Sequence, residues 1–360
     1  MTPSRRSLIR LATATAACGM VLGSGVVGAG TTTPPTTTPS TTTPSTSAPR
    51  TTVPRTTVAP TTTAAPTTTA APAPTHPLLG VPIDNPAAYT PRPALIVKID
   101  NGVNSKPQSG LNEADIVFEE IVEGRVTRFA AVFNSRDSDP VGNIRSGRSQ
   151  DVDLFMSYND PVFAYSGGNA AVNAVLFATG WTILGQGDGM FRVGGRGGAP
   201  YNLFANTSDL FSRAGDAGEA VPQFEYGAAP SGTPVAGFDL AIGSVRVSWS
   251  WDAEQGWFER SENGSPHQTT TGQVSTNNVV VLFAPYGRSA ADSSSPEAQS
   301  VGSGDVVVYR NGQRIDGTWT RDSASDPFTL TTAAGEPLLL QPGRTFVELA
   351  DAATDGVTDR

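Results

Sequence analysis

Two arginines placed three residues apart carry the clearest chemical signal in this 360-residue chain. Arg145 and Arg148 belong to the segment Gly142–Arg148, here called the arginine loop, and a helix is expected to begin after it at Ser149. A turn at this point can direct both guanidinium groups, helped by free N–H groups of the helix, at one carboxylate or phosphate. The alternative is internal pairing with protein carboxylates, such as Asp151 or those of a nearby acidic hairpin.

A carboxylate in an apolar setting is the second signal. Glu120 has apolar neighbours on its face of a predicted strand, so it requires a cation or a raised pKa. A three-residue hairpin loop between the strands 115–123 and 126–134 would place Glu120 opposite Arg128. A structural salt bridge and a catalytic carboxylate are both open interpretations. Glu119 points to the other face, so it cannot form a catalytic pair with Glu120.

Further residues could contact a ligand through backbone amides, charge or oxygen atoms. The turn Ser166–Asn169, between a strand and a helix, either only reverses the chain or cradles an anion, and it lacks the nucleophile-elbow pattern. Asp100 and Asn101, at the end of the first strand, offer oxygen ligands for Ca²⁺, although their spacing is not that of a calcium-binding loop. Arg192 and Arg196 add positive charge in a glycine-rich loop. The complete set of candidate ligand-binding residues is Arg145, Arg148, Arg128, Glu120, Asp100, Asn101, Ser166, Gly167, Gly168, Asn169, Arg192, Arg196 and Asn202.

Cysteine and histidine are almost absent, which excludes several kinds of site. Cys18 is the only cysteine, so the segment after it can hold neither a disulfide nor a thiolate zinc site. Of the two histidines, His76 lies near a linker and His267 in a polar hairpin region, where a solvated turn residue is expected. A multi-histidine metal site is therefore excluded, and no cofactor is expected.

The elements that must position these residues change in character along the chain. Strand and helix signals alternate first, with strands at 93–99, 115–123, 126–134 and 162–165 and helices at 149–158, 169–178 and 208–214. Only strand signals follow, at 244–251, 256–260, 278–283, 305–309, 313–320, 328–331 and 345–349. The predicted fold class is α+β: a layered mixed α/β N-terminal part followed by a β-rich C-terminal part.

The first 30 residues read as an export signal. Arg5 and Arg6 precede an apolar, Ala- and Gly-rich run, a pattern that resembles the twin-arginine leader of exported folded proteins. Cleavage after Ala29, lipidation of Cys18 in a lipoprotein-like box, and retention as an anchor are the three possible fates. Each of them places the remaining chain outside the cytoplasm, with membrane contact only through the signal or a lipid.

A Thr/Pro-rich linker over residues 31–75 follows, with composition too polar to build a core. Its prolines favour an extended chain at ~3.1 Å per residue, and its threonines are either plain or O-glycosylated. Residues 76–360 hold 19 basic and 33 acidic residues, a formal charge of −14. This charge argues against nucleic acid as a partner.

The segment from Pro222 to Thr233 has few sequence signals of a helix or a strand, which predicts a domain boundary there. The expected organisation is an export signal at 1–30, a disordered linker at 31–75, an α/β domain at 76–230, a β-rich domain at 231–352 and a tail at 353–360.

Ordered motifs along the chain together indicate a family. They are Pro77–Gly80, Val97–Asn101, Pro107–Leu111, Ala114–Val117, Glu120–Gly124, Thr127–Phe129, Gly142–Arg148, Tyr165–Gly168, Ala199–Leu203 and Gly317–Trp319. This set resembles the YerB-like lipoproteins, domain-of-unknown-function family 3048, over about 77–349. The resemblance implies an extracytoplasmic protein with a mixed α/β, layered fold, and it brings no established activity. Tyr201 stands where the family pattern has histidine, and Asn143 and Gly147 replace its proline and alanine.

These observations lead to three hypotheses for function. The first is an exported, envelope-associated protein that binds an anionic or sugar-containing cell-wall or envelope component through an arginine-and-amide pocket. The second is a hydrolase or transferase acting on cell-wall glycan or a phosphorylated lipid, with Glu120, Asp151 or Asp153 as acid or base and the loop arginines as charge stabilisers. The third is a protein-interaction scaffold that uses the β-rich part.

Overall fold

The computed structural model describes residues 73–228 and 231–360. The predicted export signal, Cys18 and all but the last three residues of the predicted linker lie outside the described residues. Among the helices in those two ranges, none has both the length and the apolar character needed to cross a membrane.

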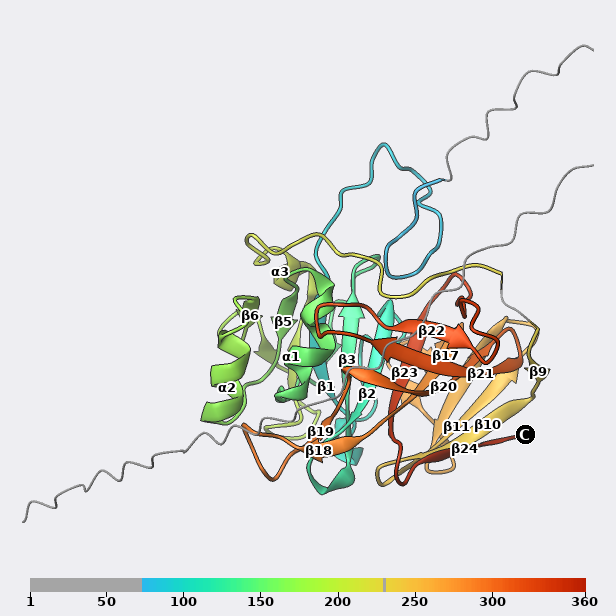
Figure 1. Cartoon of the computed structure of the whole chain (residues 1–360). Coiled ribbons are helices and arrows are strands. Elements are labelled where there is room, and N and C mark those ends of the chain that lie inside the picture. The colour runs from blue at the N-terminus through green and yellow to red at the C-terminus, as the bar shows by residue number, and fades with distance from the viewer. Residues whose placement is uncertain (1–72, 229–230) are drawn as a thin grey trace, which may run out of the picture. The chain divides into compact units, whose positions relative to one another are not determined.

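An eleven-stranded mixed sheet takes strands from both predicted domains (Figure 1). Its order is β22-β21-β20-β17-β23-β2-β3-β1-β5-β6, and β9 pairs with β21 off this path. The bounds are β1 Leu95–Asp100, β2 Ile116–Ile121, β3 Thr127–Phe133, β5 Val162–Ala164, β6 Thr182–Leu184, β9 Thr233–Pro234, β17 Asn278–Ala284, β20 Gly302–Arg310, β21 Gln313–Arg321, β22 Thr329–Thr332 and β23 Thr345–Asp351.

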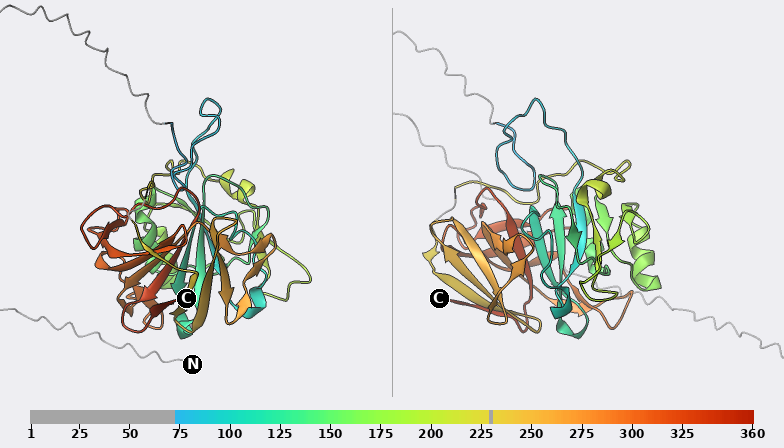
Figure 2. Two further views of the ribbon diagram at one scale, coloured as in Figure 1. Left: turned by 90° about the vertical axis from the view of Figure 1, so that its right-hand side faces the viewer. Right: turned by 180° about the vertical axis from the view of Figure 1, so that it is seen from behind.

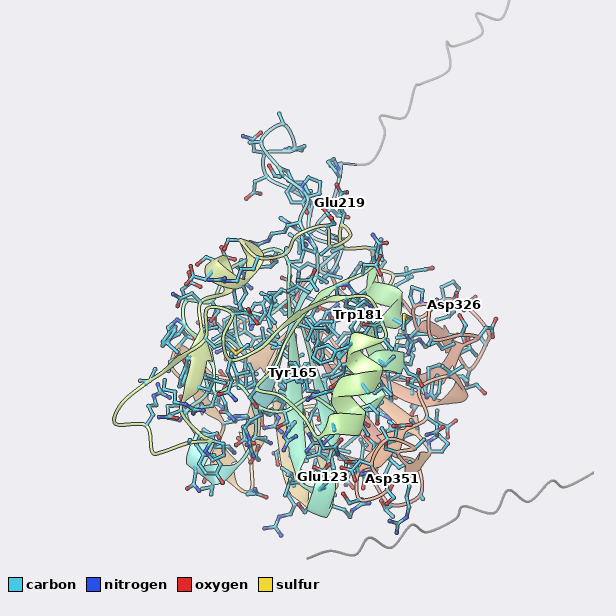
Figure 3. The ribbon with its side chains drawn as sticks, turned by 90° about the vertical axis from the view of Figure 1, so that its left-hand side faces the viewer. Glu123, Tyr165, Trp181, Glu219, Asp326 and Asp351 are labelled. Carbon is cyan, nitrogen blue, oxygen red and sulfur yellow. The ribbon has the colours of Figure 1, made fainter. Side chains whose placement is uncertain are left out.

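Six strands of this sheet, β1, β2, β5, β6, β17 and β23, run in the same direction, as does β21 beyond the antiparallel strand β20. The parallel pairs are β1 with β5, β5 with β6, β2 with β23 and β17 with β23, while β1 and β2 are both antiparallel to β3. The carboxyl ends of these six strands therefore meet at one side, here called the carboxyl edge. Figure 3 shows Glu123, which follows β2, and Asp351, which ends β23, at the same lower edge.

The predicted hairpin forms β2 and β3. Glu120 lies opposite Arg128 in the observed register, as predicted. Gly124 and Arg125 have φ of 69° and 58°, so the left-handed loop conformation on which the register depended is confirmed.

The remaining strands form smaller sheets. A six-stranded sheet has the order β13-β12-β11-β10-β24 with β16 beside β12, and a three-stranded one the order β4-β8-β7. The bounds are β4 Val141–Gly142, β7 Phe191–Arg192, β8 Leu203–Ala205, β10 Gly237–Ile242, β11 Val245–Asp252, β12 Trp257–Glu262, β13 Ser265–Pro266, β16 Ser275–Thr276 and β24 Gly356–Asp359. Two hairpins pair β14 Gln268–Thr269 with β15 Gly272–Gln273 and β18 Tyr286–Arg288 with β19 Pro296–Ala298. The predicted α+β class with a β-rich C-terminal part is confirmed.

Both faces of the large sheet are covered, because its central strands are apolar on both sides. On one face pack α1 (Gln150–Phe155) and α2 (Ala170–Phe177), through side chains such as Phe155 and Leu176. On the other face pack α3 (Thr207–Phe211) and the six-stranded sheet. Figure 2 shows the cyan-to-green and the orange-to-red strands side by side in the large sheet.

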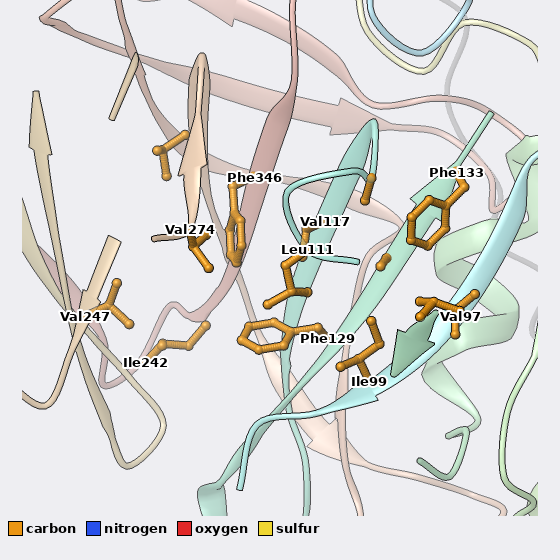
Figure 4. Close-up of a cluster of buried hydrophobic side chains, with 14 of the residues drawn as sticks. Val97, Ile99, Leu111, Val117, Phe129, Phe133, Ile242, Val247, Val274 and Phe346 are labelled. Carbon is orange, nitrogen blue, oxygen red and sulfur yellow. The ribbon is translucent and has the colours of Figure 1, made fainter. Parts of the chain in front are cut away.

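Large apolar side chains fill the layer between the two sheets. Figure 4 shows Phe129 of β3 and Phe346 of β23 within this layer, together with Val247 of β11. The rings of Phe129 and Phe346 meet edge to face at 5.9 Å. Such burial stabilises by roughly 25 cal/mol for each Å² of apolar surface removed from water, so this layer joins the two predicted domains firmly.

Three local expectations differ from the structure. Ser149 precedes α1 but makes no capping bond, because its hydroxyl binds Glu297 instead. The helix predicted over 149–158 is α1 followed by a 3₁₀ turn at Met156–Tyr158. Residues 353–360, expected to be a tail, contain β24, which pairs with β10. Its partner β10 alternates buried apolar residues, Phe238, Leu240 and Ile242, with exposed residues, a period-two pattern typical of a strand.

Candidate functional site

The arginine loop enters the large sheet between the carboxyl ends of two parallel strands. β1 and β5 pair only over their first three residues. Beyond that point, the carbonyl of Lys98 accepts a bond from the amide of Arg145 at 2.8 Å, and the amide of Asp100 donates to Asn143 at 3.0 Å. The amide of Ser166, after β5, donates to the carbonyl of Arg145 at 2.9 Å. In open α/β sheets, ligands bind outside the carboxyl ends where neighbouring strands separate.

Three arginines converge at this opening. Arg145 and Arg148 come from the loop, and Arg128, the second residue of β3, lies opposite Asp100 at the end of β1. Arg148 binds Glu123 of the β2–β3 hairpin, and Nε of Arg145 lies 3.3 Å from Oδ1 of Asp100. The internal pairing that the sequence left open is therefore observed for both loop arginines, although one carboxylate partner, Glu123, is partly exposed.

Arg128 differs from the two loop arginines. It is only 8% exposed, and its one hydrogen bond runs from Nη1 to the carbonyl of Ser146 at 3.2 Å. Its Nε has no partner, and within the described ranges no carboxylate lies within 4 Å of its guanidinium. Burial and the nearby charges of Arg148 and Arg145 lower the pKa of Arg128 to about 10. The charges of Glu123 and Asp100 offset this effect only in part, so a further anion would stabilise the Arg128 guanidinium.

A second wall faces these arginines. The turn Ser166–Asn169 leads into α2, and Oδ1 of Asn169 caps that helix by accepting from the amide of Val172 at 2.9 Å. The sequence expected helix amides from α1, but the amide of Arg148 donates to the Asp151 side chain at 2.6 Å and α1 has fewer than two turns. The amino end of α2 therefore replaces α1 in the site.

Arg148 and the Ser166–Asn169 turn border a pocket of about 450 Å³, here called the anion pocket. It is lined by Glu123, Ser146, Arg148, Ser166, Gly167, Gly168, Asn169, Val172 and Asp292. Asp292 comes from the loop between β18 and β19, and its Oδ2 accepts from Nδ2 of Asn169 at 2.8 Å. The β-rich part of the chain thus completes a pocket built by the α/β part.

The two carboxylates of the anion pocket are poorly suited to acid catalysis. Burial alone would raise the pKa of Glu123, but hydrogen bonds from Arg148 and Ser295 lower it below its ordinary value. Hydrogen bonds from Ser294 lower the pKa of Asp292. A general acid for glycoside cleavage needs a raised pKa, so neither group matches that role.

A fully buried charge cluster supports the arginine loop from beneath. Nζ of Lys98 lies 2.6 Å from Oε1 of Glu120 and 2.7 Å from Oδ1 of Asp151, and all three side chains are 0% exposed. Nε2 of Gln150 donates to Glu120 at 2.9 Å. Glu120 therefore binds Lys98 rather than Arg128, although the predicted register holds. A ligand in the anion pocket cannot reach these groups, so their role is to position the loop.

Glu120 should make stability depend on pH. Burial and the charge of Asp151, partly offset by Lys98, raise the pKa of Glu120 to about 7 from its ordinary 4.5. The folded state thus binds this proton more tightly than the unfolded state, and its stabilising effect, complete below pH 4.5, is lost as pH rises through about 7. Between pH 5 and pH 8, the unfolding free energy of the wild type should fall by ~2–3 kcal/mol more than that of E120Q.

Urea unfolding at both pH values measures this difference. E254Q, at an exposed turn after β11, serves as the matched control and should keep the wild-type pH dependence. Equal pH dependence in E120Q and the wild type would contradict the proton assignment.

The opposite face of the sheet holds a second buried network. Arg260 of β12 lies 2.6 Å from Glu119 and 2.9 Å from Glu262, and its Nε is 3.9 Å from Glu348. His267, expected to be solvated, is 2% exposed and contacts Arg260. Burial, Arg260 and Lys106 lower the pKa of His267 well below its ordinary value, so it is neutral at pH 7. It is a packed structural residue, because its ring lies 5.8 Å from that of Phe129 and its Nε2 lies 3.0 Å from Oε1 of Gln108.

The remaining predicted residues separate into different surroundings. Asp100 faces the arginines, whereas Asn101 points to the other face and donates to Glu262 at 2.9 Å. A joint calcium site at these two residues is therefore not formed. Arg192 donates to Asn202 at 2.9 Å, and Arg196 donates to the carbonyl of Pro107 at 2.5 Å, away from the anion pocket.

Sequence reasoning missed Lys98, Asp292 and Asn143 as contributors. Lys98 could have been recognised from the sequence, because it is one of only two lysines in the chain and interrupts an apolar strand. Asp292 could not have been recognised in this way, since its position in the pocket depends on a contact with Asn169, more than a hundred residues away in the sequence.

Comparison with known proteins assigns the chain to a family. The N-terminal domain profile of "Protein of unknown function (DUF3048)" matches residues 78–220, and its C-terminal domain profile matches 238–347. The Bacillus subtilis (strain 168) protein named "Putative lipoprotein YerB" is 24% identical over 302 residues, which are 77% of this chain and 87% of that protein. The crystal structure of YerB protein from Bacillus subtilis, 20% identical, superposes with a TM-score of 0.67 over 79% of this chain and 99% of that chain, a likeness of fold. The resemblance inferred from the motifs is thus confirmed, and the chain belongs to the DUF3048 family, with both its N- and C-terminal domains.

Proposed function

We propose that this protein is exported to the cell envelope, where its anion pocket binds a phosphate or carboxylate group of a cell-wall or envelope component. The observation that carries the proposal is Arg128, a buried guanidinium with an unpaired Nε, which is not itself in the pocket lining but donates to the carbonyl of Ser146, a residue that is. Perturbed charged groups of this kind concentrate at functional sites because a ligand supplies the missing partner. The amide-rich turn before α2 adds donors that suit an anion.

The envelope location is supported by two independent observations. The leader resembles a twin-arginine export signal, and the Bacillus subtilis relative carries the name of a lipoprotein. Export and either lipidation of Cys18 or cleavage near Ala29 are part of the proposal. The Thr/Pro-rich linker would then space the folded part from the membrane.

Binding has more support than catalysis. Of the three carboxylates considered as acid or base, Glu120 and Asp151 are 0% exposed and bound to Lys98. Burial and the charge of Glu297 raise the pKa of Asp153, as a general acid requires, but Asp153 lies outside the anion pocket. The scaffold hypothesis has less support because the exposed large apolar side chains of the described residues are dispersed, for example at Val103 and Val301.

The variant R128M separates a ligand site from a structural role. Removing a buried, unpaired charge is expected to raise the unfolding free energy by ~1–2 kcal/mol. The same change should lower the affinity for inorganic phosphate by at least about tenfold, since a charge-assisted hydrogen bond is worth ~1.5–3 kcal/mol. Calorimetric titration with phosphate and urea unfolding of the full-length protein measure both quantities.

The matched control is R246M, which removes an exposed arginine from β11. It should change stability by no more than ~0.5 kcal/mol and leave phosphate affinity as it is. Loss of stability in R128M together with unchanged phosphate affinity would reject the site and make Arg128 a structural residue.

A further inference from the structure

A second and larger pocket also takes part of its lining from the arginine loop. It has a volume of about 890 Å³ and is here called the glycine-loop pocket. Its lining consists of Val103, Asn104, Lys106, Pro107, Asn143, Val193, Gly194, Gly195, Arg196, Gly197, Gly198 and Tyr201. A Cβ added at any of the four glycines would meet no atom within 4 Å, so the glycine loop is not packed against the protein. The hollow beside it is open to a ligand.

The glycine-loop pocket presents neutral polar groups. Among the described residues that line it there is no carboxylate. Its two cations already have partners, because Lys106 binds Glu262 and Arg196 donates to the carbonyl of Pro107. The lining groups that remain available to contact a ligand are side-chain amides, the backbone and the ring of Tyr201. An aromatic ring with a few placed hydrogen-bonding groups is suited to a neutral ring-shaped ligand.

Asn143 supplies a polar group that lacks a partner. Its side chain is 0% exposed, and its Nδ2 donates to the carbonyl of Tyr201. This bond fixes the orientation of the amide, since a carbonyl can only accept. Oδ1 is therefore the atom left without a partner, a buried acceptor in the lining of the pocket. A hydroxyl or amide N–H of a ligand would remove the unfavourable free energy of that unpaired acceptor.

The arginine loop connects the two pockets. Asn143 lines one and Ser146 lines the other, so three residues of extended chain, at most ~10 Å, separate them. Arg145 lies between them, with its guanidinium carbon 5.6 Å from the ring centre of Tyr201. One ligand can reach both pockets if it joins a neutral ring to a charged group.

We propose that the glycine-loop pocket is a sugar-binding subsite, and that the ligand is a glycan whose phosphate or carboxylate group occupies the anion pocket. This inference rests on the proposed anion site and adds the class of the molecule that carries the anion. The sugar hydroxyls or an acetamido N–H would donate to Oδ1 of Asn143, and the sugar ring would lie against Tyr201.

The test compares four probes by calorimetric titration of the full-length protein: inorganic phosphate, N-acetylglucosamine 6-phosphate, N-acetylmuramic acid and N-acetylglucosamine. At least one of the two anionic sugars should bind at least tenfold tighter than inorganic phosphate, and the tighter one identifies phosphate or carboxylate as the anion. Tyr201→Ala should remove this advantage and change phosphate affinity less than threefold. Tyr201→Phe, which keeps the ring, should retain most of it. Tyr89→Ala, at a partly buried tyrosine elsewhere, is the control and should bind like the wild type.

Two results would overturn the inference, and only one of them also rejects the anion site. If phosphate binds but neither anionic sugar binds more tightly, the sugar subsite is wrong and the anion site stands. If phosphate does not bind, the proposed function fails, and binding of N-acetylglucosamine that Tyr201→Ala abolishes would still support the subsite. Absence of binding by all four probes rejects both.

Discussion

Replacing Arg260 by methionine is expected to lower the unfolding free energy by ~4–5 kcal/mol, or to prevent folding altogether. Arg260 is 0% exposed and is the only guanidinium within 4 Å of Glu119 and Glu262 among the described ion pairs. Removing it would leave Glu119 buried beside Glu348 without a cation, while Glu262 would keep only Lys106, and breaking a buried pair costs about 3–5 kcal/mol. Burial and the charge of Glu119 already raise the pKa of Glu348 well above its ordinary value, which shows how little further negative charge this region tolerates.

Urea unfolding of R260M against R314M provides the measurement. Arg314 of β21 pairs with Asp316 and Asp359 at the surface, so its removal should cost less than ~1 kcal/mol. Adding Glu119→Gln to R260M should recover part of the loss, because it removes one stranded charge. A loss below ~1 kcal/mol in R260M would mean that the carboxylates take up protons at no appreciable cost.

The second large effect is expected for Lys98. The variant K98M should lose ~3–5 kcal/mol, because Glu120 and Asp151 would remain buried without their shared cation. The folded fraction should also bind phosphate more weakly, since Asp151 holds the backbone amide of Arg148 in the arginine loop.

The chain's only other lysine gives the control. Lys106 pairs with Glu262 and is partly exposed, so K106M should cost only ~1 kcal/mol. Thermal and urea unfolding of both variants, with phosphate titration of the folded K98M, test the assignment. Equal losses of unfolding free energy in K98M and K106M would contradict the assignment, because they would show that the buried Lys98 pairs stabilise the fold no more than the partly exposed Lys106 pair.

Local pattern predicted much of the fold. The period-two alternation around Glu120 gave the correct strand, both of its faces and the register with Arg128. The identity of the partner was not predictable in the same way, because Lys98 reaches Glu120 only when β1 lies on the far side of β3. Sequence spacing defines neighbours within a hairpin, whereas strand order in a sheet is decided by the whole fold.

The candidate site was predictable to a similar extent. Arg145, Arg148 and the turn before α2 were recognised by residue type and spacing, and the structure brings Arg148 and that turn together in the anion pocket. The importance of Arg128 depends on what is missing around it, a carboxylate, and absence of a partner leaves no mark in a sequence. The same holds for Oδ1 of Asn143.

The position of β23 has a consequence for how the chain folds during synthesis. This strand fills the space between β17 and β2, and it spans residues 345–351. Until the ribosome has released that segment, β2 has one open edge and Phe129 lacks its contact with Phe346. Such long-range pairing is slow to form and leaves a strand edge open to wrong partners. The α/β half therefore cannot complete its sheet until residues 345–351 have left the ribosome, more than 200 residues after β2 has been made.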